Sequence, residues 1–431
     1  MLRVEGPLAI VQLLETTLLN LINFPSLITT NAARMRSAAG AGKTLLEFGL
    51  RRAQGPDGGL TASKYSYVGG FNGTSNVLAG KLFDIAVKGT HAHSFVMSYT
   101  GLQDIRDTSI ISNSGETAGQ AVEFVQRVLD KRTELGYTRS NEGELAAFIA
   151  YAQSFPAGFL ALVDTYDILK SGIKNFIAVG VVLHELGYKP IGVRIDSGDL
   201  AYFSRQIRKE FRLFDQEVMK CKVFAEANIV ASNDINEKVL LALAVEGHEI
   251  DTFGIGTHLV TCQSQPALGC VFKLVEINQQ PRIKLSQDIG KMVIPGKKIV
   301  YRLYGQDSKP LLDLMTLAHE PAPVAGERIL VRHPINPQMR AYVEPTSVKP
   351  LLNLVFDGTL RGSNPGHSGI VPEHVESLEQ ARALCITELA SLRSDHTRVL
   401  NPTPYKISVS ESLYDFIQKL WLSEAPIADL K

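Results

Sequence analysis

The sequence predicts an α/β fold, with a closed β/α barrel followed by a second region of short strands and helices. Between residues 83 and 257, short apolar segments alternate with helical segments, and most of the apolar segments are continuous runs. Such runs are typical of parallel strands that are covered on both faces. Each run ends in a polar cluster, and the five strand ends favour a closed barrel over a small open sheet. A two-layer arrangement is the alternative, because the number of strands does not determine whether the sheet closes.

The N-terminal segment is predicted to be helical. Residues 7–38 are expected to form mostly helix, interrupted near Pro25 because proline lacks an amide hydrogen. Four leucines have the spacing of one buried helix face: Leu13, Leu14, Leu18 and Leu21. The apolar run at residues 8–22 contains polar residues and has no basic leader. It is therefore predicted to be a core helix and not a signal peptide or a membrane span.

Residues 39–44 (AGAGKT) come close to a phosphate-binding loop. That pattern requires glycine where Ser37 stands, and it requires a strand before the loop, whereas a helix is predicted here. A turn between two helices is therefore expected, with the second helix over residues 45–52. The glycine-rich turn that follows leads into a further helix, which Ser75 or Asn76 is expected to cap.

The remaining elements follow from hydrophobic periodicity and turn residues. Barrel strands are predicted at 83–87, 159–163, 191–195, 227–231 and 250–253, with helices at 115–136, 142–154 and 174–187. After residue 268 the pattern changes to short strands separated by turns, which indicates a second domain. Its predicted strands are 271–275, 282–285 and 299–303, and its predicted helices lie near 375–393 and 410–422.

Composition excludes several classes of protein. Lysine plus arginine and aspartate plus glutamate both number 44, so the net charge is zero, which argues against a general binder of nucleic acid or of anionic membranes. The four cysteines include no C-x-x-C pair, so neither a disulfide framework nor a zinc site is predicted. Reduced thiols indicate an intracellular, cytosolic protein.

Two loops at the ends of the last predicted barrel strands are candidates for phosphate binding. They are Ser232-Asn233-Asp234 and Gly254-Ile255-Gly256-Thr257. Backbone amides in a glycine turn, together with a helix N-terminus, attract phosphate, and the final strand-helix loops of barrel enzymes are a frequent phosphate site. The alternative is that each loop is a tight turn.

The segment Arg194-Ile195-Asp196-Ser197-Gly198-Asp199 is a second candidate site. Arg194 and Asp196 alternate along a strand and should face the same side, where the arginine can hold a carboxylate or a phosphate through two hydrogen bonds. Asp196 and Asp199 are candidates for binding a sugar diol or Mg²⁺. The alternative is a structural Arg–Asp ion pair beside a capped helix start.

Two histidines and two arginines complete the candidates. His91 and His93 alternate after a predicted strand and are expected to share a face. No cysteine or third histidine lies nearby, so no metal site is assigned to them. Each is either a buried structural histidine or a nucleophile or base whose second nitrogen is held by a carboxylate. Arg51 and Arg52 are adjacent, so that one can reach a phosphate while the other is solvated.

Several segments together resemble the nicotinate phosphoribosyltransferase family. They are Gly89-Thr90-x-Ala92-His93-Ser94, Arg194-x-Asp196-Ser197-Gly198-Asp199, Gly254-Ile255-Gly256-Thr257, Glu47-Phe48-Gly49-x-Arg51-Arg52, Gly58-Gly59 and Asp164-Thr165-Tyr166. They occur in the order of the family, and the resemblance covers essentially the whole chain. It implies an irregular β/α barrel of the type II phosphoribosyltransferase kind plus an α/β domain built from the chain ends.

The resemblance also implies domain boundaries and a reaction. Residues 1–20 would be a remnant of an N-terminal α/β domain, residues 21–267 the barrel, and residues 268–431 a strand-and-helix region packing with the N-terminal domain. The implied reaction joins nicotinate and phosphoribosyl pyrophosphate to give nicotinate mononucleotide and pyrophosphate. It is coupled to ATP hydrolysis and is the first step of NAD synthesis from nicotinate.

By the same resemblance His93 is the residue phosphorylated by ATP, and Asp196 is predicted to be catalytic. Thr90 and Arg194 would contact nicotinate, with Arg194 recognising its carboxylate. The predicted phosphoribosyl pyrophosphate contacts are Thr257, Gly256, Gly254, Ser197, Gly198, Arg52, Ser232 and Asn233. Mg²⁺ (or Mn²⁺) is the expected cofactor, ATP the co-substrate, and a cytosolic homodimer without nucleic-acid or membrane partners the expected state.

Two features depart from the family pattern. His91 stands where the family commonly has an apolar residue, so it is interpreted as a neighbour of the site. Met1 matches a point well inside the pattern, so the segment with a Leu-x-x-x-Tyr-type motif, whose tyrosine stacks on nicotinate across a dimer interface in the family, is expected to be missing. Weak or absent activity is therefore predicted for this chain alone.

Other functions remain open. One is a relative with the same barrel that uses nicotinamide or quinolinate. Use of nicotinamide requires a side chain that recognises its amide group, and use of quinolinate requires a more basic pocket. Another is a truncated chain that only dimerises with, or regulates, a full-length enzyme.

Overall fold

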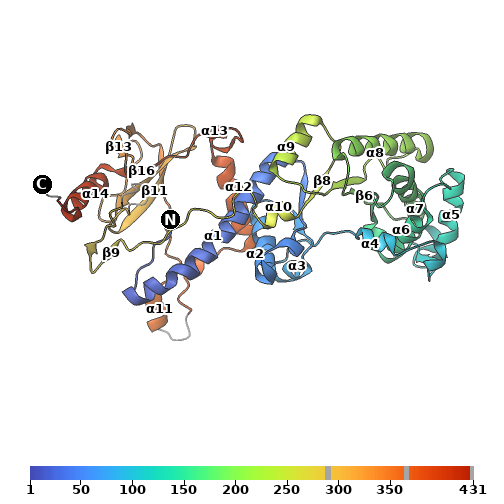
Figure 1. Cartoon of the computed structure of the whole chain (residues 1–431), viewed down its shortest axis with the longest axis horizontal. Helices are drawn as coiled ribbons and strands as arrows, with labels where there is room; N and C mark the ends of the chain where they lie inside the picture. Colours follow the sequence, from blue (N-terminus) through green and yellow to red (C-terminus); the bar gives the residue numbers. More distant parts are fainter. Residues whose placement is uncertain (287–292, 364–367, 428–431) are drawn as a thin grey trace. The chain divides into compact units, whose positions relative to one another are not determined.

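The computed structural model describes residues 1–286, 293–363 and 368–427, and the chain forms two compact units (Figure 1). The unit Phe24–Leu268 is called the barrel unit below. The second unit joins Met1–Asn23 to Gly269–Lys431 and is called the chain-end unit. Every predicted site residue lies in the barrel unit.

The barrel unit is built on six parallel strands in the order β2-β1-β8-β7-β6-β5. Their bounds are β1 (Thr44–Glu47), β2 (Gly73–Thr74), β5 (Leu160–Leu162), β6 (Gly192–Ile195), β7 (Asn228–Ala231) and β8 (Thr252–Ile255). Because all are parallel, their carboxyl ends lie at one edge of the sheet, where parallel α/β sheets place their ligands.

A short segment joins the two outer strands of this sheet. Val87 forms a parallel bridge with Thr74 of β2, and four residues later His91 Nε2 accepts a hydrogen bond from the Leu162 amide of β5 (3.1 Å). Residues 87–91 thus span the gap between the two outer strands of an irregular barrel without a strand pairing to β5, and the predicted α/β class is confirmed.

Helices cover this sheet, and the core lies between the two layers. They are α1 (Leu8–Ala39), α2 (Gly55–Val68), α3 (Val77–Phe83), α4 (His93–Met97), α5 (Val125–Glu134), α6 (Glu142–Ser154), α7 (Ile173–Glu185), α8 (Leu200–Phe214), α9 (Glu237–Glu246) and α10 (Thr257–Val260). Helix α7 is the most deeply buried and packs against both α5 and α6, which lie near it in Figure 1. Its fully buried Phe176 stacks on Phe159 and meets Phe224 edge-on, and both of these rings are fully buried as well.

Three predicted elements are wrong in type. The helix expected over 45–52 is strand β1 followed by a short helical turn, because Leu45 and Leu46 are buried between β2 and β8. The strand expected at 83–87 is the end of α3 and an extended segment that pairs only at Val87. The helix expected at 115–136 begins at Val125, after a hairpin of β3 (Ser109–Ile111) and β4 (Ala121–Glu123).

Helix α1 differs from prediction in two ways. It continues through Pro25, and its buried residues lie after that proline, among them Leu27, Ile28 and Met35. Leu13 and Leu21, predicted to face a core, are 78% and 63% exposed. Helix α1 is also long and apolar enough to span a membrane, a test that core helices and signal sequences pass as well.

The chain-end unit contains a second six-stranded sheet, ordered β14-β13-β16-β12-β11-β15. Its strands are β11 (Lys298–Tyr304), β12 (Pro310–Leu317), β13 (Ile329–Arg332), β14 (Arg340–Val343), β15 (Ser347–Pro350) and β16 (Ile407–Ser410). The unit also includes β9 (Glu276–Ile277), β10 (Gln280–Pro281), α11 (Gly358–Ser363), α12 (Leu378–Ser391), α13 (Ser394–Thr397) and α14 (Glu411–Glu424). The described residues form no strand at 271–275 or at 282–285. Between residues 271 and 285 the chain pairs only in the short β9–β10 ladder.

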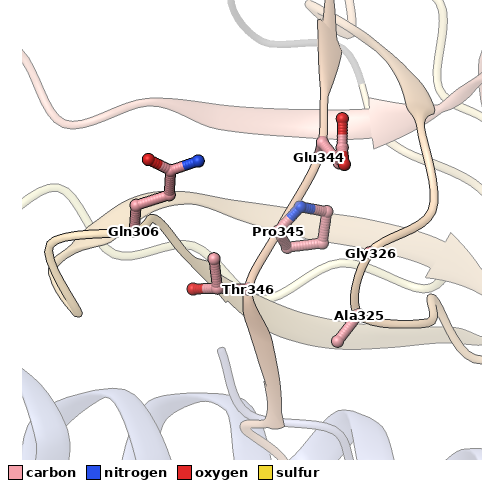
Figure 2. A pocket seen from close by; sticks show the side chains of 6 residues that line it. All are labelled: Gln306, Ala325, Gly326, Glu344, Pro345 and Thr346. Atoms are coloured by element: carbon pink, nitrogen blue, oxygen red, sulfur yellow. The ribbon is translucent and has the colours of Figure 1, made fainter.

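Figure 2 shows an open pocket in the chain-end unit. It is lined by Gln306, Ala325, Gly326, Glu344, Pro345 and Thr346. Glu344 is the one charged residue of this lining, and the pocket contains none of the predicted site residues. It therefore takes no part in the candidate site.

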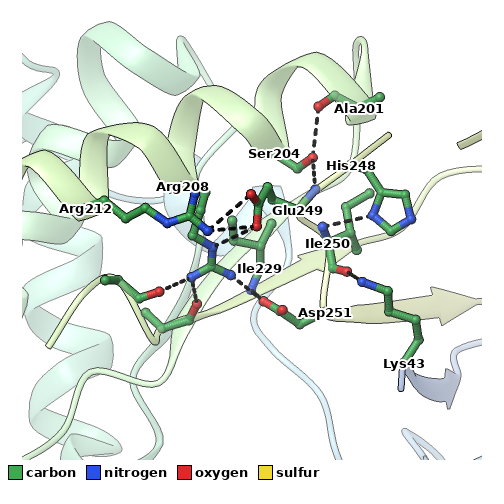
Figure 3. A network of polar contacts seen from close by, with 12 residues as sticks. Lys43, Ala201, Ser204, Arg208, Arg212, Ile229, His248, Glu249, Ile250 and Asp251 are labelled. Carbon is green, nitrogen blue, oxygen red and sulfur yellow. Dashed lines mark hydrogen bonds and ion pairs between the residues drawn. The ribbon is translucent and has the colours of Figure 1, made fainter. Parts of the chain in front are cut away.

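A buried arginine ties together the amino ends of β7 and β8, away from the edge where the site lies (Figure 3). Arg208 of α8 donates to the carbonyl oxygens of Ala225 (2.6 Å) and Ala227 (2.8 Å) and to Asp251 Oδ2 (2.6 Å). The same Asp251 oxygen accepts the Ile229 amide at 2.8 Å. Residues at this end of a barrel contribute to stability and not to catalysis.

Replacing Arg208 with methionine is expected to lower the free energy of unfolding by about 2–4 kcal/mol, because two carbonyls and a carboxylate lose their donor. The matched change in exposed Arg212, paired with Glu249, should cost less than about 0.5 kcal/mol. Urea denaturation monitored by circular dichroism tests this prediction. Tryptophan fluorescence would not report on the barrel unit, because Trp421, the single tryptophan, lies in the other unit. Equal effects of the two substitutions would contradict it.

Candidate active site

The centre of the site is Arg194 on β6, whose guanidinium is held on three sides. Its Nε donates to Ser232 Oγ (2.8 Å), its Nη1 donates to Thr90 Oγ1 (2.9 Å), and its Nη2 lies 3.3 Å from Asp196 Oδ1. Ser232 in turn donates to the same Asp196 oxygen at 2.5 Å. Arg194 and Asp196 thus face the same side, as the strand alternation predicts.

His93, the first residue of α4, faces this cluster. Its Nδ1 lies 3.0 Å from Thr165 Oγ1. Its Nε2 is 3.7 Å from Asp196 Oδ2 and 3.8 Å from Asp164 Oδ1. One ring nitrogen is therefore held by a hydroxyl, and the other faces two carboxylates.

Asp164 is a site residue to which the sequence reasoning gave no role. Its side chain is 1% exposed, and its Oδ2 accepts from the Asp196 amide (2.9 Å) and the Ser197 hydroxyl (2.5 Å). Its Oδ1, which faces His93, has no hydrogen-bond partner in the described part of the chain. A buried carboxylate oxygen in this position is suited to a cationic or hydrogen-bonded imidazole. The signal that could have identified it is its place directly after the apolar run 159–163, where the predicted strand ends.

His91 and His93 do not share a face, contrary to prediction. The residues around them do not form a strand, and the backbone enters α4 at His93. The His91 ring packs against the rings of Phe95, Phe148 and Tyr151, with centroids 5.4, 6.0 and 4.8 Å away. Burial lowers the pKa of His91 to about 4, so this ring is neutral at physiological pH.

An aromatic wall borders the arginine. The Phe48 ring lies 5.6 Å from the Arg194 guanidinium carbon. It packs against Gly254 so closely that a Cβ at that position would stand 2.4 Å from two ring carbons. Glycine is therefore required at position 254 because the Phe48 ring packs against it. The sequence suggests a different reason, a glycine turn that binds phosphate.

Buried Glu47 holds the loop that carries Phe48. Its carboxylate accepts from the Ser63 hydroxyl (2.9 Å), the Thr74 hydroxyl (2.5 Å) and the Gly49 amide. The residue is 1% exposed, and the three donors come from α2, β2 and the loop itself. This network fixes the loop after β1 against the neighbouring elements.

The predicted phosphate loops stand at the same edge of the sheet. Asn233 follows β7 with a φ of 111°, and Gly198 follows β6 with a φ of 76°, so both loops turn sharply at the strand ends. Thr257 begins α10 directly after Gly256, and a Cβ on Gly256 would approach the Phe48 carbonyl to 3.1 Å. The Arg52 side chain is exposed and makes no hydrogen bond or ion pair within the described residues, whereas its backbone amide donates to Gly49, so the structure does not bring the guanidinium to the cluster.

Comparisons with known proteins agree with the resemblance. The sequence profile of the "Nicotinate phosphoribosyltransferase C-terminal domain" matches residues 297–417. Nicotinate phosphoribosyltransferase 1 of Arabidopsis thaliana is 54% identical over 436 residues, covering 100% of this chain and 76% of that protein. The nicotinate phosphoribosyltransferase of Dictyostelium discoideum is 49% identical over 438 residues, covering 100% of this chain and 72% of that protein.

The crystal structure of human nicotinic acid phosphoribosyltransferase has the same architecture. It superposes with a TM-score of 0.83 at 42% sequence identity, over 96% of this chain and 78% of that one. The predicted type II phosphoribosyltransferase fold, a barrel plus a domain built from the chain ends, is thereby confirmed. With such identity along its whole length, this chain belongs to the nicotinate phosphoribosyltransferase family.

Proposed function

We propose that this protein joins nicotinate to phosphoribosyl pyrophosphate, giving nicotinate mononucleotide and pyrophosphate with coupled ATP hydrolysis, as the first step of NAD synthesis from nicotinate. The observation that carries the proposal is Arg194, immobilised beside an aromatic ring and opposite a histidine. The names of the relatives, which are nicotinate phosphoribosyltransferases, support the same reaction.

The nicotinate carboxylate is the natural ligand for the hydrogen-bond donors that Arg194 has left. A guanidinium has about five N–H groups, of which the protein engages three here. Each of the two terminal nitrogens keeps one free N–H group, and together these two groups can donate to the two oxygens of a carboxylate. A ring attached to that carboxylate would lie beside Phe48. A nicotinamide amide, which carries no negative charge, would gain less from this arginine.

Replacing Gly254 with alanine should displace the Phe48 ring and raise the KM for nicotinate by about tenfold or more, because small misplacements in a site have large effects. Gly42→Ala is the control, since nothing lies within 4 Å of a Cβ there. Steady-state kinetics of both variants provide the measurement. If the KM for nicotinate in Gly254→Ala equals that of the control, the Phe48 ring does not border the nicotinate site.

His93 is proposed as the phosphate acceptor from ATP. When Nδ1 donates its hydrogen to Thr165, the lone pair of Nε2 is free to attack the γ-phosphorus, and the bond from that phosphorus to ADP breaks. Later hydrolysis of the N–P bond releases phosphate and restores the imidazole. A phosphate on this nitrogen would place negative charge near the sugar carbon, where positive charge develops as pyrophosphate leaves.

Phosphoribosyl pyrophosphate is proposed to lie across the loops after β6, β7 and β8. Ser197, Gly198, Ser232, Asn233, Gly254, Gly256 and Thr257 would supply donors there, and Arg52 would have to turn inward to join them. The described residues contain no cluster of three or more side chains suited to a metal. Mg²⁺ (or Mn²⁺) would therefore bind mainly to substrate phosphates, with Asp196 Oδ2 as a carboxylate ligand, and would neutralise the leaving pyrophosphate.

A homodimer in the cytosol is the proposed state. The main alternative is a chain that only associates with, or regulates, an active enzyme. The proposed activity is tested against this alternative by incubating the purified chain with phosphoribosyl pyrophosphate, ATP, Mg²⁺ and, separately, nicotinate, nicotinamide or quinolinate. Formation of nicotinate mononucleotide from nicotinate alone supports the proposal, preference for another base supports a relative on the same barrel, and no product with any base supports the regulatory alternative.

A further inference from the structure

The edge strand β5 presents a backbone amide that no neighbouring strand satisfies. The Val163 amide donates to Arg194 of β6, so the preceding amide, that of Leu162, points to the opposite side. On that side the described residues supply no strand. Leu162 is 1% exposed, so an unpaired amide there would be buried, which is costly. His91 Nε2 accepts this hydrogen bond at 3.1 Å.

The surroundings of His91 suit an acceptor. The ring lies among three aromatic side chains, and burial keeps it neutral at physiological pH. A neutral ring that accepts at Nε2 carries its hydrogen on Nδ1. Nδ1 is buried and has no hydrogen-bond partner in the described part of the chain. The hydrogen bond from Leu162 therefore orients this ring at Nε2.

The same few residues carry the groups proposed to act on substrate. The Lys88 amide donates to the Thr74 carbonyl of β2 at 2.9 Å, which anchors the segment at one edge of the sheet. Thr90 accepts from Arg194, and His93 contacts Thr165 beyond β5. His91 lies between Thr90 and His93 in the chain and anchors the segment at the other edge.

We propose that His91 is a positioning residue, whose imidazole replaces a missing strand partner of β5 and so holds Thr90 and His93 at the rim of the barrel. This inference rests on the proposed function of those two residues. It differs from a filling role, in which any apolar side chain of similar size in the aromatic cluster would serve equally well.

Three substitutions separate positioning from filling. His91→Gln can place an oxygen where Nε2 now lies and so keeps an acceptor for Leu162. His91→Asn places its oxygen near the position of Nδ1, too short to reach that amide. His91→Met fills the aromatic cluster without offering an acceptor. Circular dichroism confirms that each variant folds before it is compared.

Amide hydrogen exchange at Leu162 is the first measurement. We expect it to accelerate about tenfold or more in His91→Asn and His91→Met, and to stay within about threefold of the wild type in His91→Gln. The second is the imidazole nitrogen NMR spectrum. It should show His91 protonated at Nδ1 in the wild type, and His93 signals that shift in the Asn and Met variants and return toward wild type in Gln.

Kinetics provide the third measurement. The Asn and Met variants should lose about tenfold or more in kcat/KM for nicotinate, with partial recovery in Gln. Unchanged exchange at Leu162 or unchanged His93 signals in His91→Met would overturn the inference. Because exchange and NMR do not depend on turnover, failure of the wild type to make nicotinate mononucleotide would count against the proposed function alone.

Discussion

Replacing His93 with asparagine is expected to abolish the stimulation of nicotinate mononucleotide formation by ATP. Asparagine keeps a polar group near Thr165 but offers no nucleophilic nitrogen to the γ-phosphate. We expect the rate with saturating ATP to fall by about 10² or more, the order seen when a covalent catalytic group is removed. Initial rates with and without ATP, for wild type and variant, provide the measurement.

The matched control is His184→Asn, which changes an exposed histidine in the last turn of α7. It should retain both its rate and its response to ATP. Incubation with γ-phosphate-labelled ATP should label the wild type and the control, through a bond that is stable in base and labile in acid, but not His93→Asn. If the variant still responds to ATP as the wild type does, His93 is not the phosphate acceptor.

Replacing Arg194 with lysine is expected to produce the second large effect. Lysine keeps the charge but cannot hold Ser232 and Thr90 while offering two parallel donors to a carboxylate. The loss of a two-point, charge-assisted contact, about 2–3 kcal/mol, corresponds to about 30- to 150-fold in kcat/KM for nicotinate. The kcat/KM for nicotinamide should fall much less, so the ratio of kcat/KM for nicotinate to that for nicotinamide should decrease.

Arg212→Lys is the control for that experiment, because Arg212 is an exposed arginine on α8 paired only with Glu249 among the described residues. Rates with nicotinate and nicotinamide, measured side by side, decide the outcome. A parallel loss with both bases would mean that Arg194 maintains the shape of the site and does not read the carboxylate. Retention of full nicotinate activity would exclude it from the base pocket.

The parts of the site that are carried by regular strands could be predicted from the sequence. Arg194 lies on the buried parallel strand β6 and Asp196 directly follows its last residue, so the alternation of the strand carries both side chains to one side. The loops that contain Ser232 and Thr257 follow short, mostly apolar segments, which composition identifies as strands. In each case local periodicity determines the geometry.

The parts that depend on contacts distant in the sequence could not be predicted. The segment at 83–87 has the alternation of a strand, yet it pairs only at Val87, and the free edge of β5 donates to the His91 side chain instead. Residues 45–52 carry helix formers, but their first part is strand β1, which pairs with β2 and β8, so tertiary pairing overrides local preference there. Asp164 acquires a role only because β5 and β6 bring it beside His93.

The chain-end unit is assembled from two segments that are far apart in the chain. Arg3 donates to the carbonyl of Lys298, 295 residues later, and Glu5 pairs with Lys297. During synthesis the barrel residues leave the ribosome before Lys297 and Lys298 have been translated. The barrel unit can therefore fold cotranslationally while residues 1–23 still lack their partners in the chain-end unit. Mutations in β11 or β12 should therefore delay a late docking step on the ribosome and leave the early collapse of the barrel unaffected.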